Sequence, residues 1–210
     1  SPLCGRLADR FSAATVATVG MGLCATGLGI AATINATSPI TLAGNVLAHV
    51  AETLAGIALV QCVRKGAPGI CGSVGSIPNL RTLDHLGGPI ERAMVNAASS
   101  QMAQHFGIPM YSTGGTTDAK EVDVQCAYES AMSSLLVAMS GANYIHDIAG
   151  LMESDLTVSY EKLVVDNEIL GMNQRVLRGI EVTDDTLAVD LIAKVCRERG
   201  SERHYLAEFH

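Results

Sequence analysis

Side chains that could take part in catalysis or binding follow two short apolar runs of the sequence. Asp118 lies in the polar stretch after residues 108–112, while His146 and Asp147 end the run 142–147. A histidine at such a position could be a general base, a substrate ligand or a structural residue. A carboxylate such as Asp118 could cap a helix or hold a cationic ligand. These residue types predict proton transfer or cation binding, without naming a reaction.

Two adjacent glycines, Gly114 and Gly115, precede Thr116 and Thr117 in the same polar stretch. The backbone N–H groups of a glycine-rich loop can cradle a phosphate. However, the lysine and Ser/Thr context of a phosphate-binding loop is missing here. The simpler interpretation is a turn that leads into a helix.

The segment 159–168 is unusually polar for a helix of this protein. Its charged residues fall on several faces of the expected helix, which is typical of a solvated helix. A second interpretation is that Tyr160 and Glu161, at the start of the helix, face a functional site.

The cysteines predict the redox compartment. There are six of them, with no CxxC pair and no histidine at zinc-ligand spacing. Most stand among Ala, Val and Gly, as buried thiols do in a reducing cytosol. We therefore expect a cytoplasmic protein without a metal site or a disulfide framework. The cysteines are Cys4, Cys24, Cys62, Cys71, Cys126 and Cys196.

The composition favours a folded protein with a sizeable core. Hydrophobic residues make up 48% of the 210 residues, charged residues make up 17%, and the formal net charge is −7. Disorder is excluded by this balance. An acidic chain with 4% aromatic residues and no Trp is a poor match for a nucleic-acid surface, so no nucleic-acid partner is expected.

No charged residue occurs between Arg10 and Glu52. The segment 13–34 is long enough to span a membrane, but it is rich in Gly and Thr and poor in large aliphatic residues. A buried strand with its packed helix produces the same charge-free pattern. We therefore expect no membrane association.

Four strand–loop–helix units follow one another along the chain. The expected strands are residues 30–34, 69–74, 108–112 and 142–147. The expected helices are residues 38–65, 89–105, 118–140 and 159–178, with a final helix over 186–199. Helix caps are expected at Ser38, at Asp118 with Glu121, and at Thr183. This order predicts an α/β fold with a parallel sheet and a site at the carboxyl ends of its strands.

The spacing of the units narrows the architecture. Units about 33 to 40 residues apart are common in a (β/α)8 TIM barrel, which needs about 250 residues or more. The chain is then either a complete open sheet or about half of a barrel. The start at Ser1 without Met, and the abrupt end, favour a fragment. We expect a single partial-barrel domain over residues 1–210, with a poorly assigned lead-in helix at 1–29.

Several longer motifs occur in order from about residue 30 to the end of the chain. They are TSPITLAG at 37–44, AETLAG at 51–56, GGTTDAK at 114–120, GANYIH at 141–146 and SYEKLVVDNEI at 159–169. Together they resemble the trimethylamine:corrinoid methyltransferase family. The resemblance implies a (β/α)8 barrel of about twice this length, of which this chain is the second half.

The resemblance also implies a reaction. The family moves a methyl group from a methylated or quaternary amine to the cobalt of a separate corrinoid protein, a step that feeds methane formation in methanogens. Relatives demethylate betaines. The expected partners are therefore a cognate corrinoid protein and a small methylated amine, with no tightly bound cofactor and a possible homo-oligomer. If the pyrrolysine position of the trimethylamine-specific members lies in this segment, a betaine is the favoured substrate.

A methylated ammonium group is held by aromatic faces and carboxylates. On this basis we assign catalytic roles to His146 and Asp118. The predicted substrate-binding residues are Tyr111, Gly114, Gly115, Tyr144, Glu153, Tyr160 and Glu161. Two alternatives stay open: another TIM-barrel enzyme with a phosphorylated or anionic substrate, and a non-catalytic half-barrel that works only with a partner chain.

Overall fold

The computed structural model describes residues 41–73, 75 and 77–197. At its centre is a parallel sheet of three short strands in the order β1-β4-β5. These are β1 (Cys71–Gly72), β4 (Met110–Thr113) and β5 (Tyr144–His146). The expected α/β class with a parallel sheet is confirmed. The expected strand at 30–34 lies outside the described residues.

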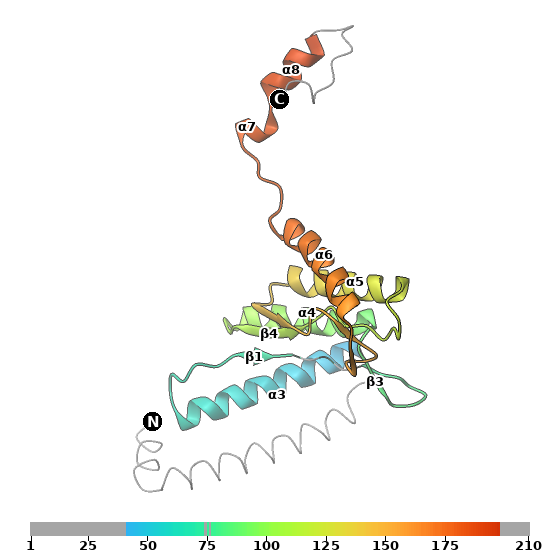
Figure 1. Ribbon diagram of the computed structural model, residues 1–210. Coiled ribbons are helices and arrows are strands. Elements are labelled where there is room, and N and C mark those ends of the chain that lie inside the picture. The colour runs from blue at the N-terminus through green and yellow to red at the C-terminus, as the bar shows by residue number, and fades with distance from the viewer. Residues whose placement is uncertain (1–40, 74, 76, 198–210) are drawn as a thin grey trace. The chain divides into compact units, whose positions relative to one another are not determined.

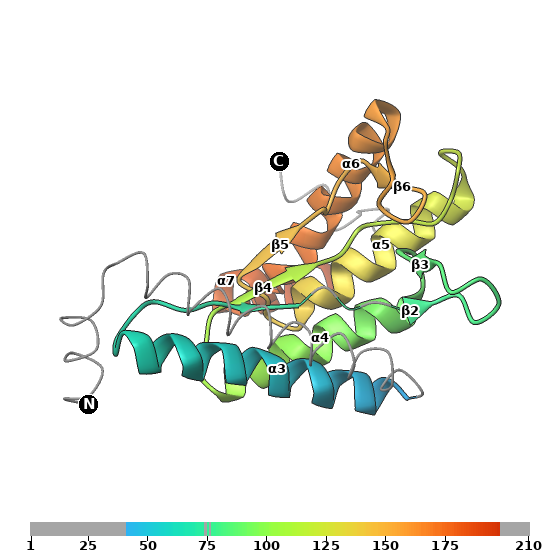
Figure 2. The same ribbon diagram turned by 90° about the horizontal axis from the view of Figure 1, so that it is seen from below.

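Four helices alternate with these strands: α3 (Leu42–Val63), α4 (Ile90–His105), α5 (Val124–Met139) and α6 (Tyr160–Leu177). Each helix packs against the next along the chain, and α3 and α4 also contact the sheet. Figures 1 and 2 show the four helices side by side, with the strands running along them. This repeated strand–helix order agrees with the pattern predicted from the sequence.

Two expected helix caps are wrong. The N-cap of α3 is Thr41, whose hydroxyl accepts from the N–H of Gly44, and not Ser38. The N-cap of α5 is Asp123, which accepts from the N–H of Cys126. Asp118 does not cap this helix because its carboxylate is engaged by groups from other loops, described below.

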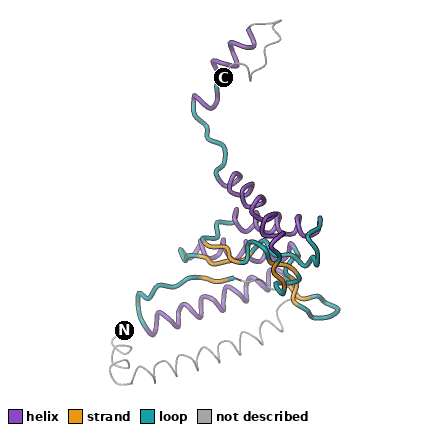
Figure 3. The backbone as a smooth tube through the Cα atoms, viewed as in Figure 1, coloured by secondary structure: helices purple, strands orange, loops and turns teal. Residues whose placement is uncertain are grey.

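Two stretches that we expected to be plain loops contain hairpins (Figure 3). One pairs β2 (Ile77–Pro78) with β3 (His85–Leu86), and the other pairs β6 (Leu151–Met152) with β7 (Thr157–Val158). The first hairpin follows β1 and the second follows β5. Both therefore stand at the carboxyl end of a sheet strand, where the site is expected.

The sheet separates a helix side from an open side. Met110 is fully buried and packs with Ala103 of α4 and with Cys71. Because side chains alternate along a strand, Tyr111 faces the opposite side of the sheet. Tyr144 pairs with Tyr111 in register and is 58% exposed. The side away from the helices is thus aromatic and partly open.

The buried positions of α4 and α5, two helices that pack against each other, are rich in small residues. The hydroxyls of Ser100, Ser133 and Ser134 donate to carbonyls of their own helix, and that of Ser130 donates to the carbonyl of Gly115. The buried small residues are Ala93, Ala97, Ser99, Ser100 and Ala103 on α4, and Ser130, Ser133 and Ser134 on α5.

The chain divides into two compact units, residues 1–177 and 178–210. In the second unit, Thr183 and Thr186 form a capping box, as the expected cap at Thr183 requires. The single helix predicted over 186–199 is wrong, because Ala188 has a positive φ of 48° and separates α7 (Asp184–Leu187) from α8 (Val189–Arg197). One domain over the whole chain stays a prediction, and the lead-in helix at 1–29 lies outside the described residues.

Among the described helices, α3 is long and apolar enough to cross a membrane by length and composition alone. It packs against α4 and β1, as a helix that covers a sheet does. The segment 13–34, considered above as a span, lies outside the described residues.

Candidate functional site

The carboxyl ends of β1 and β4 are tied together by Asn96, which is buried on α4. Its Oδ1 accepts from the hydroxyl of Ser73 at 3.0 Å and from the N–H of Gly75 at 2.7 Å. Its Nδ2 donates to the carbonyl of Thr113 at 3.0 Å. One amide side chain thereby fixes the starting points of two site loops.

A buried arginine, Arg92, joins four segments at this end of the sheet. Its Nε donates to the carbonyl of Gly75 at 2.9 Å, and its Nη1 donates to the hydroxyl of Thr116 at 2.7 Å and to the carbonyl of Gly87 at 3.2 Å. Its Nη2 forms an ion pair with Asp155 at 3.0 Å. With an exposed fraction of 2%, Arg92 acts as an internal cross-link of the loops.

Asp155 also contacts the other hairpin. Its Oδ2 lies 3.3 Å from Nε2 of His85, which stands on β3. The side chains of His85 and Asp155 are 36% and 25% exposed. The two hairpins that follow β1 and β5 are therefore bridged over the loop that follows β4.

Asp118 lies in that loop and is held from several sides. Its Oδ1 accepts from the N–H of Gly87 at 2.6 Å and from the hydroxyl of Ser154 at 2.7 Å. Its own N–H donates to Oε2 of Glu129 at 2.9 Å, and the Thr117 hydroxyl donates to the same oxygen at 2.5 Å. Among the described residues, Oδ2 of Asp118 receives no hydrogen bond. Asp118 thus presents one fixed and one available carboxylate oxygen.

The loop after β4 is also held by a buried ion pair on α6, Lys162 with Asp166. Nζ of Lys162 donates to the carbonyl of Gly115 at 2.8 Å and to Oδ2 of Asp166 at 2.5 Å. That oxygen also accepts from the N–H of Gly150 at 2.7 Å. Lys162 is 0% exposed and Asp166 is 1% exposed. The solvated-helix interpretation of segment 159–168 is therefore wrong for these two residues.

Close packing requires glycine at position 115 and leaves little room for a side chain at Gly114. Gly115 has a φ of +87°, and a Cβ there would lie 2.4 Å from the carbonyl oxygen of Ile148. A Cβ on Gly114 would lie 3.2 Å from the carbonyl oxygen of Ser133. The N–H of Gly115 is already donated to the hydroxyl of Ser133 at 2.9 Å. Backbone atoms of other segments therefore lie close to both glycines. Because the N–H of Gly115 is already hydrogen-bonded to Ser133, it does not support the idea of a phosphate-binding loop.

Three rings stack on the open side of the sheet. The ring of Tyr111 lies 4.4 Å from that of His146 and 5.3 Å from that of Tyr144, centroid to centroid, with interplanar angles of 10° and 9°. Nδ1 of His146 lies 2.8 Å from the carbonyl of Ser112, and its Nε2 lies 2.8 Å from Oδ2 of Asp147. Both neighbouring atoms are acceptors, and which of them receives a hydrogen bond from the ring depends on the tautomer of His146. His146 is thus held between two acceptors, with its ring against the face of Tyr111.

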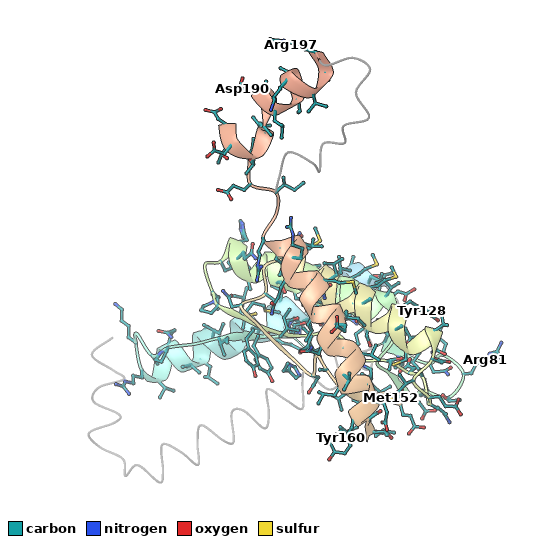
Figure 4. All side chains as sticks on the ribbon, turned by 45° about the horizontal axis from the view of Figure 1, so that its top comes forward. Arg81, Tyr128, Met152, Tyr160, Asp190 and Arg197 are labelled. Atoms are coloured by element: carbon teal, nitrogen blue, oxygen red, sulfur yellow. The ribbon has the colours of Figure 1, made fainter. Side chains whose placement is uncertain are left out.

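Three predicted site residues contribute no side chain to these groups. The carboxylate of Glu153 accepts from the hydroxyl of Thr157 at 2.5 Å on an exposed part of its hairpin. Tyr160 is 82% exposed and projects outward at the start of α6 (Figure 4). The pKa of Glu161 is lowered by its own backbone N–H and by the hydroxyl of Ser159. Among the described contacts, none joins these residues to Asp118 or to the ring stack.

Comparison with known proteins adds to this geometry. A family model described as trimethylamine methyltransferase matches residues 13–210. The chain belongs to this family. The resemblance seen in the motifs is confirmed.

Individual relatives of the trimethylamine methyltransferase family carry two activities in their names. A trimethylamine methyltransferase of Desulfitobacterium hafniense is 38% identical over 175 residues, which is 83% of this chain and 34% of the relative. A glycine betaine methyltransferase of the same species is 37% identical over 174 residues, 83% of this chain and 36% of the relative. A trimethylamine methyltransferase of Methanosarcina barkeri is 41% identical over 158 residues, 75% of this chain and 32% of the relative. The chain spans about a third of the length of these curated relatives.

Within this member of the trimethylamine methyltransferase family, the structure brings together some predicted residues and adds others. Tyr111, Tyr144 and His146 form one group, while Asp118 and Gly115 belong to the loop after β4. The residues that sequence reasoning missed are His85, Arg92, Asn96, Glu129, Asp155, Lys162 and Asp166. A signal was present for four of them: Arg92 with Asn96 and Lys162 with Asp166 are i,i+4 pairs, so each pair shares one face of its helix.

Among the described residues, no group of three or more His, Cys, Asp or Glu side chains could hold a metal ion. The side chains at the strand ends instead provide one available carboxylate oxygen, an aromatic stack and a histidine held between two acceptors. This set can bind a cation and hold or release a proton.

Proposed function

We propose that this chain contributes part of the amine site of a methyltransferase that transfers a methyl group from a methylated amine to the cobalt of a corrinoid protein. Membership of the trimethylamine methyltransferase family carries the proposal, since relatives are named for trimethylamine and for glycine betaine. We further propose that the three-stranded sheet is a segment of a (β/α)8 barrel. Parallel strands that alternate with helices on one side support that architecture.

Methyl transfer from nitrogen is a displacement at carbon. The corrinoid of a partner protein supplies the nucleophile. The amine site then has to bind the substrate cation, orient one methyl group and exclude water. No Ser, Cys or Lys nucleophile is needed in this chain, and the buried Lys162 is engaged by Asp166 and Gly115.

Two groups of side chains match these tasks. Oδ2 of Asp118 can accept from or attract an ammonium group, and the exposed ring of Tyr144 offers a surface for N-methyl groups. His146 can donate a proton to the nitrogen of a neutral tertiary-amine substrate, so that a neutral secondary amine leaves, with Asp147 as the partner of His146. A quaternary substrate needs no such proton because its leaving group is already a neutral amine.

We also propose that the reaction takes place in the cytoplasm. Cys62, Cys71 and Cys126 are free thiols, as in a reducing compartment. We propose that the methyl acceptor, a separate corrinoid protein, docks on the side of the sheet that faces away from the helices.

The test is a methyl-transfer assay in which methylcobalamin formation from cob(I)alamin is followed spectroscopically. Trimethylamine and glycine betaine are supplied separately, with and without a corrinoid protein from an organism that holds a close relative. We expect transfer from at least one amine and a loss of about 100-fold in kcat/KM for Asp118→Asn, if the carboxylate charge stabilises the bound cation. Folded full-length protein that contains this chain and transfers no methyl group from either amine would contradict the proposal.

A further inference from the structure

The hairpin after β5 contains an unusual backbone turn. Glu153, Ser154 and Asp155 have φ angles of 51°, 57° and 70°. Residues with a Cβ avoid this left-handed region, and none of these three is glycine. A run of such residues persists only when surrounding contacts hold it, and runs of this kind occur at functional sites.

This turn is docked on the loop after β4 by its backbone. The N–H of Ser154 donates to the carbonyl of Thr117 at 3.3 Å, and the N–H of Glu153 donates to the carbonyl of Ala119 at 3.3 Å. The Asp155 carboxylate is held in addition by the buried guanidinium of Arg92. The turn is therefore anchored without help from the Ser154 side chain.

The Ser154 hydroxyl has a separate task. It donates to Oδ1 of Asp118 at 2.7 Å, while the N–H of Gly87 donates to the same oxygen at 2.6 Å. Two donors from two different hairpins fix the plane of the carboxylate. The other oxygen of this carboxylate, Oδ2, has no hydrogen-bond partner among the described residues.

We propose that Ser154 is a positioning residue that orients the Asp118 carboxylate so that Oδ2 binds the ammonium group of the substrate. This inference rests on the proposed function, because it assumes an amine at Asp118. The positive φ angles of the turn direct the Ser154 hydroxyl toward Asp118.

The test compares Ser154→Gly with the unchanged 210-residue chain. Glycine adopts a positive φ without strain, so this variant removes the hydroxyl and keeps the turn. Ser154→Ala serves as a second variant without the hydroxyl. Thr157→Ala is the matched control, since it removes a hydroxyl-to-carboxylate bond on the same hairpin away from Asp118.

The readout is the binding of two cations, measured by calorimetry. Trimethylammonium carries one N–H at neutral pH, whereas tetramethylammonium has almost the same size and no N–H. An oriented Oδ2 accepts that N–H, so the unchanged chain binds trimethylammonium more tightly. Loss of a charge-assisted hydrogen bond predicts about tenfold weaker binding of trimethylammonium to Ser154→Gly, with less than about twofold change for tetramethylammonium. Thr157→Ala keeps both affinities.

Equal losses for both cations, or no loss in either Ser154 variant, overturns the positioning role while the amine site stands. If the unchanged chain binds neither cation, the proposed amine site fails and the role of Ser154 fails with it. Because a structural defect would weaken both cations alike, a selective loss of trimethylammonium supports orientation of Asp118.

Discussion

The buried Lys162–Asp166 pair allows a stability prediction to be worked out from its contacts. Replacing Lys162 by Met keeps the length of the side chain and removes its charge. The variant leaves the Asp166 carboxylate, 1% exposed, with the Gly150 N–H as its remaining donor. It also leaves the carbonyl of Gly115 without the Lys162 donor.

The expected loss of stability follows from these two defects. Breaking one partner of a buried ion pair costs about 3–5 kcal/mol, because the remaining charge is uncompensated. For a chain of this size, 1 kcal/mol corresponds to a shift of roughly 2–4 °C in Tm, so we expect Lys162→Met to lower Tm by roughly 6–20 °C. The pair itself adds little net stability, so the double variant with Asp166→Leu should recover most of the loss.

The assay is urea unfolding followed by circular dichroism, with thermal melts of the same three variants and the unchanged chain. A loss below about 1 kcal/mol for Lys162→Met would refute the argument, since a surface ion pair behaves in that way. Simple additivity of the two single changes would also refute it, because it would mean that the charges do not interact.

Three further predictions concern other parts of the first unit. Burial lowers the pKa of His49 below 6.5, partly offset by a hydrogen bond to the backbone of Gly72, so the unfolded state binds more protons in acid. Stability should therefore fall as the pH drops below about 6.5, and His49→Gln should flatten that part of the stability profile. Burial raises the pKa of the Cys126 thiol, so an alkylating reagent should modify the exposed Cys62 well before Cys126, as peptide mass spectrometry can show. Gly115→Ala should destabilise the protein by about 2 kcal/mol or more in urea unfolding, because the added Cβ meets a backbone carbonyl at a positive φ; an unchanged midpoint would contradict the packing described for this loop.

The sequence predicted the framework of the first unit because its signals are local. Apolar runs followed by polar loops and capped helices recur along the chain, so strands β4 and β5 and helices α4 and α6 fall close to their expected ranges. The caps failed where a side chain had a competing partner. Asp118 has the spacing of a helix cap, but donors from Gly87 and Ser154 engage its carboxylate.

The candidate site was only partly predictable, because several of its side chains are held by residues far away in the sequence. Tyr111 and Tyr144 were identified as aromatic residues that could hold a methylated ammonium group, and His146 because it ends an expected strand. Arg92 and Lys162 were missed, because a charged residue on a helix is solvated in most proteins and only long-range contacts show that it is buried.

By itself the sequence determined the α/β class, the alternation of strands and helices and membership of the methyltransferase family, all of which depend on residues close together in the chain or on motif order. The tertiary structure decided which oxygen of Asp118 is available, which hairpins meet over it and which charges are buried. Those features join residues 30 to 70 positions apart, such as Gly87 with Asp118, Ser154 with Asp118 and His85 with Asp155. Local propensity carries no information about such pairs, because their contact exists only once the helices and strands have packed.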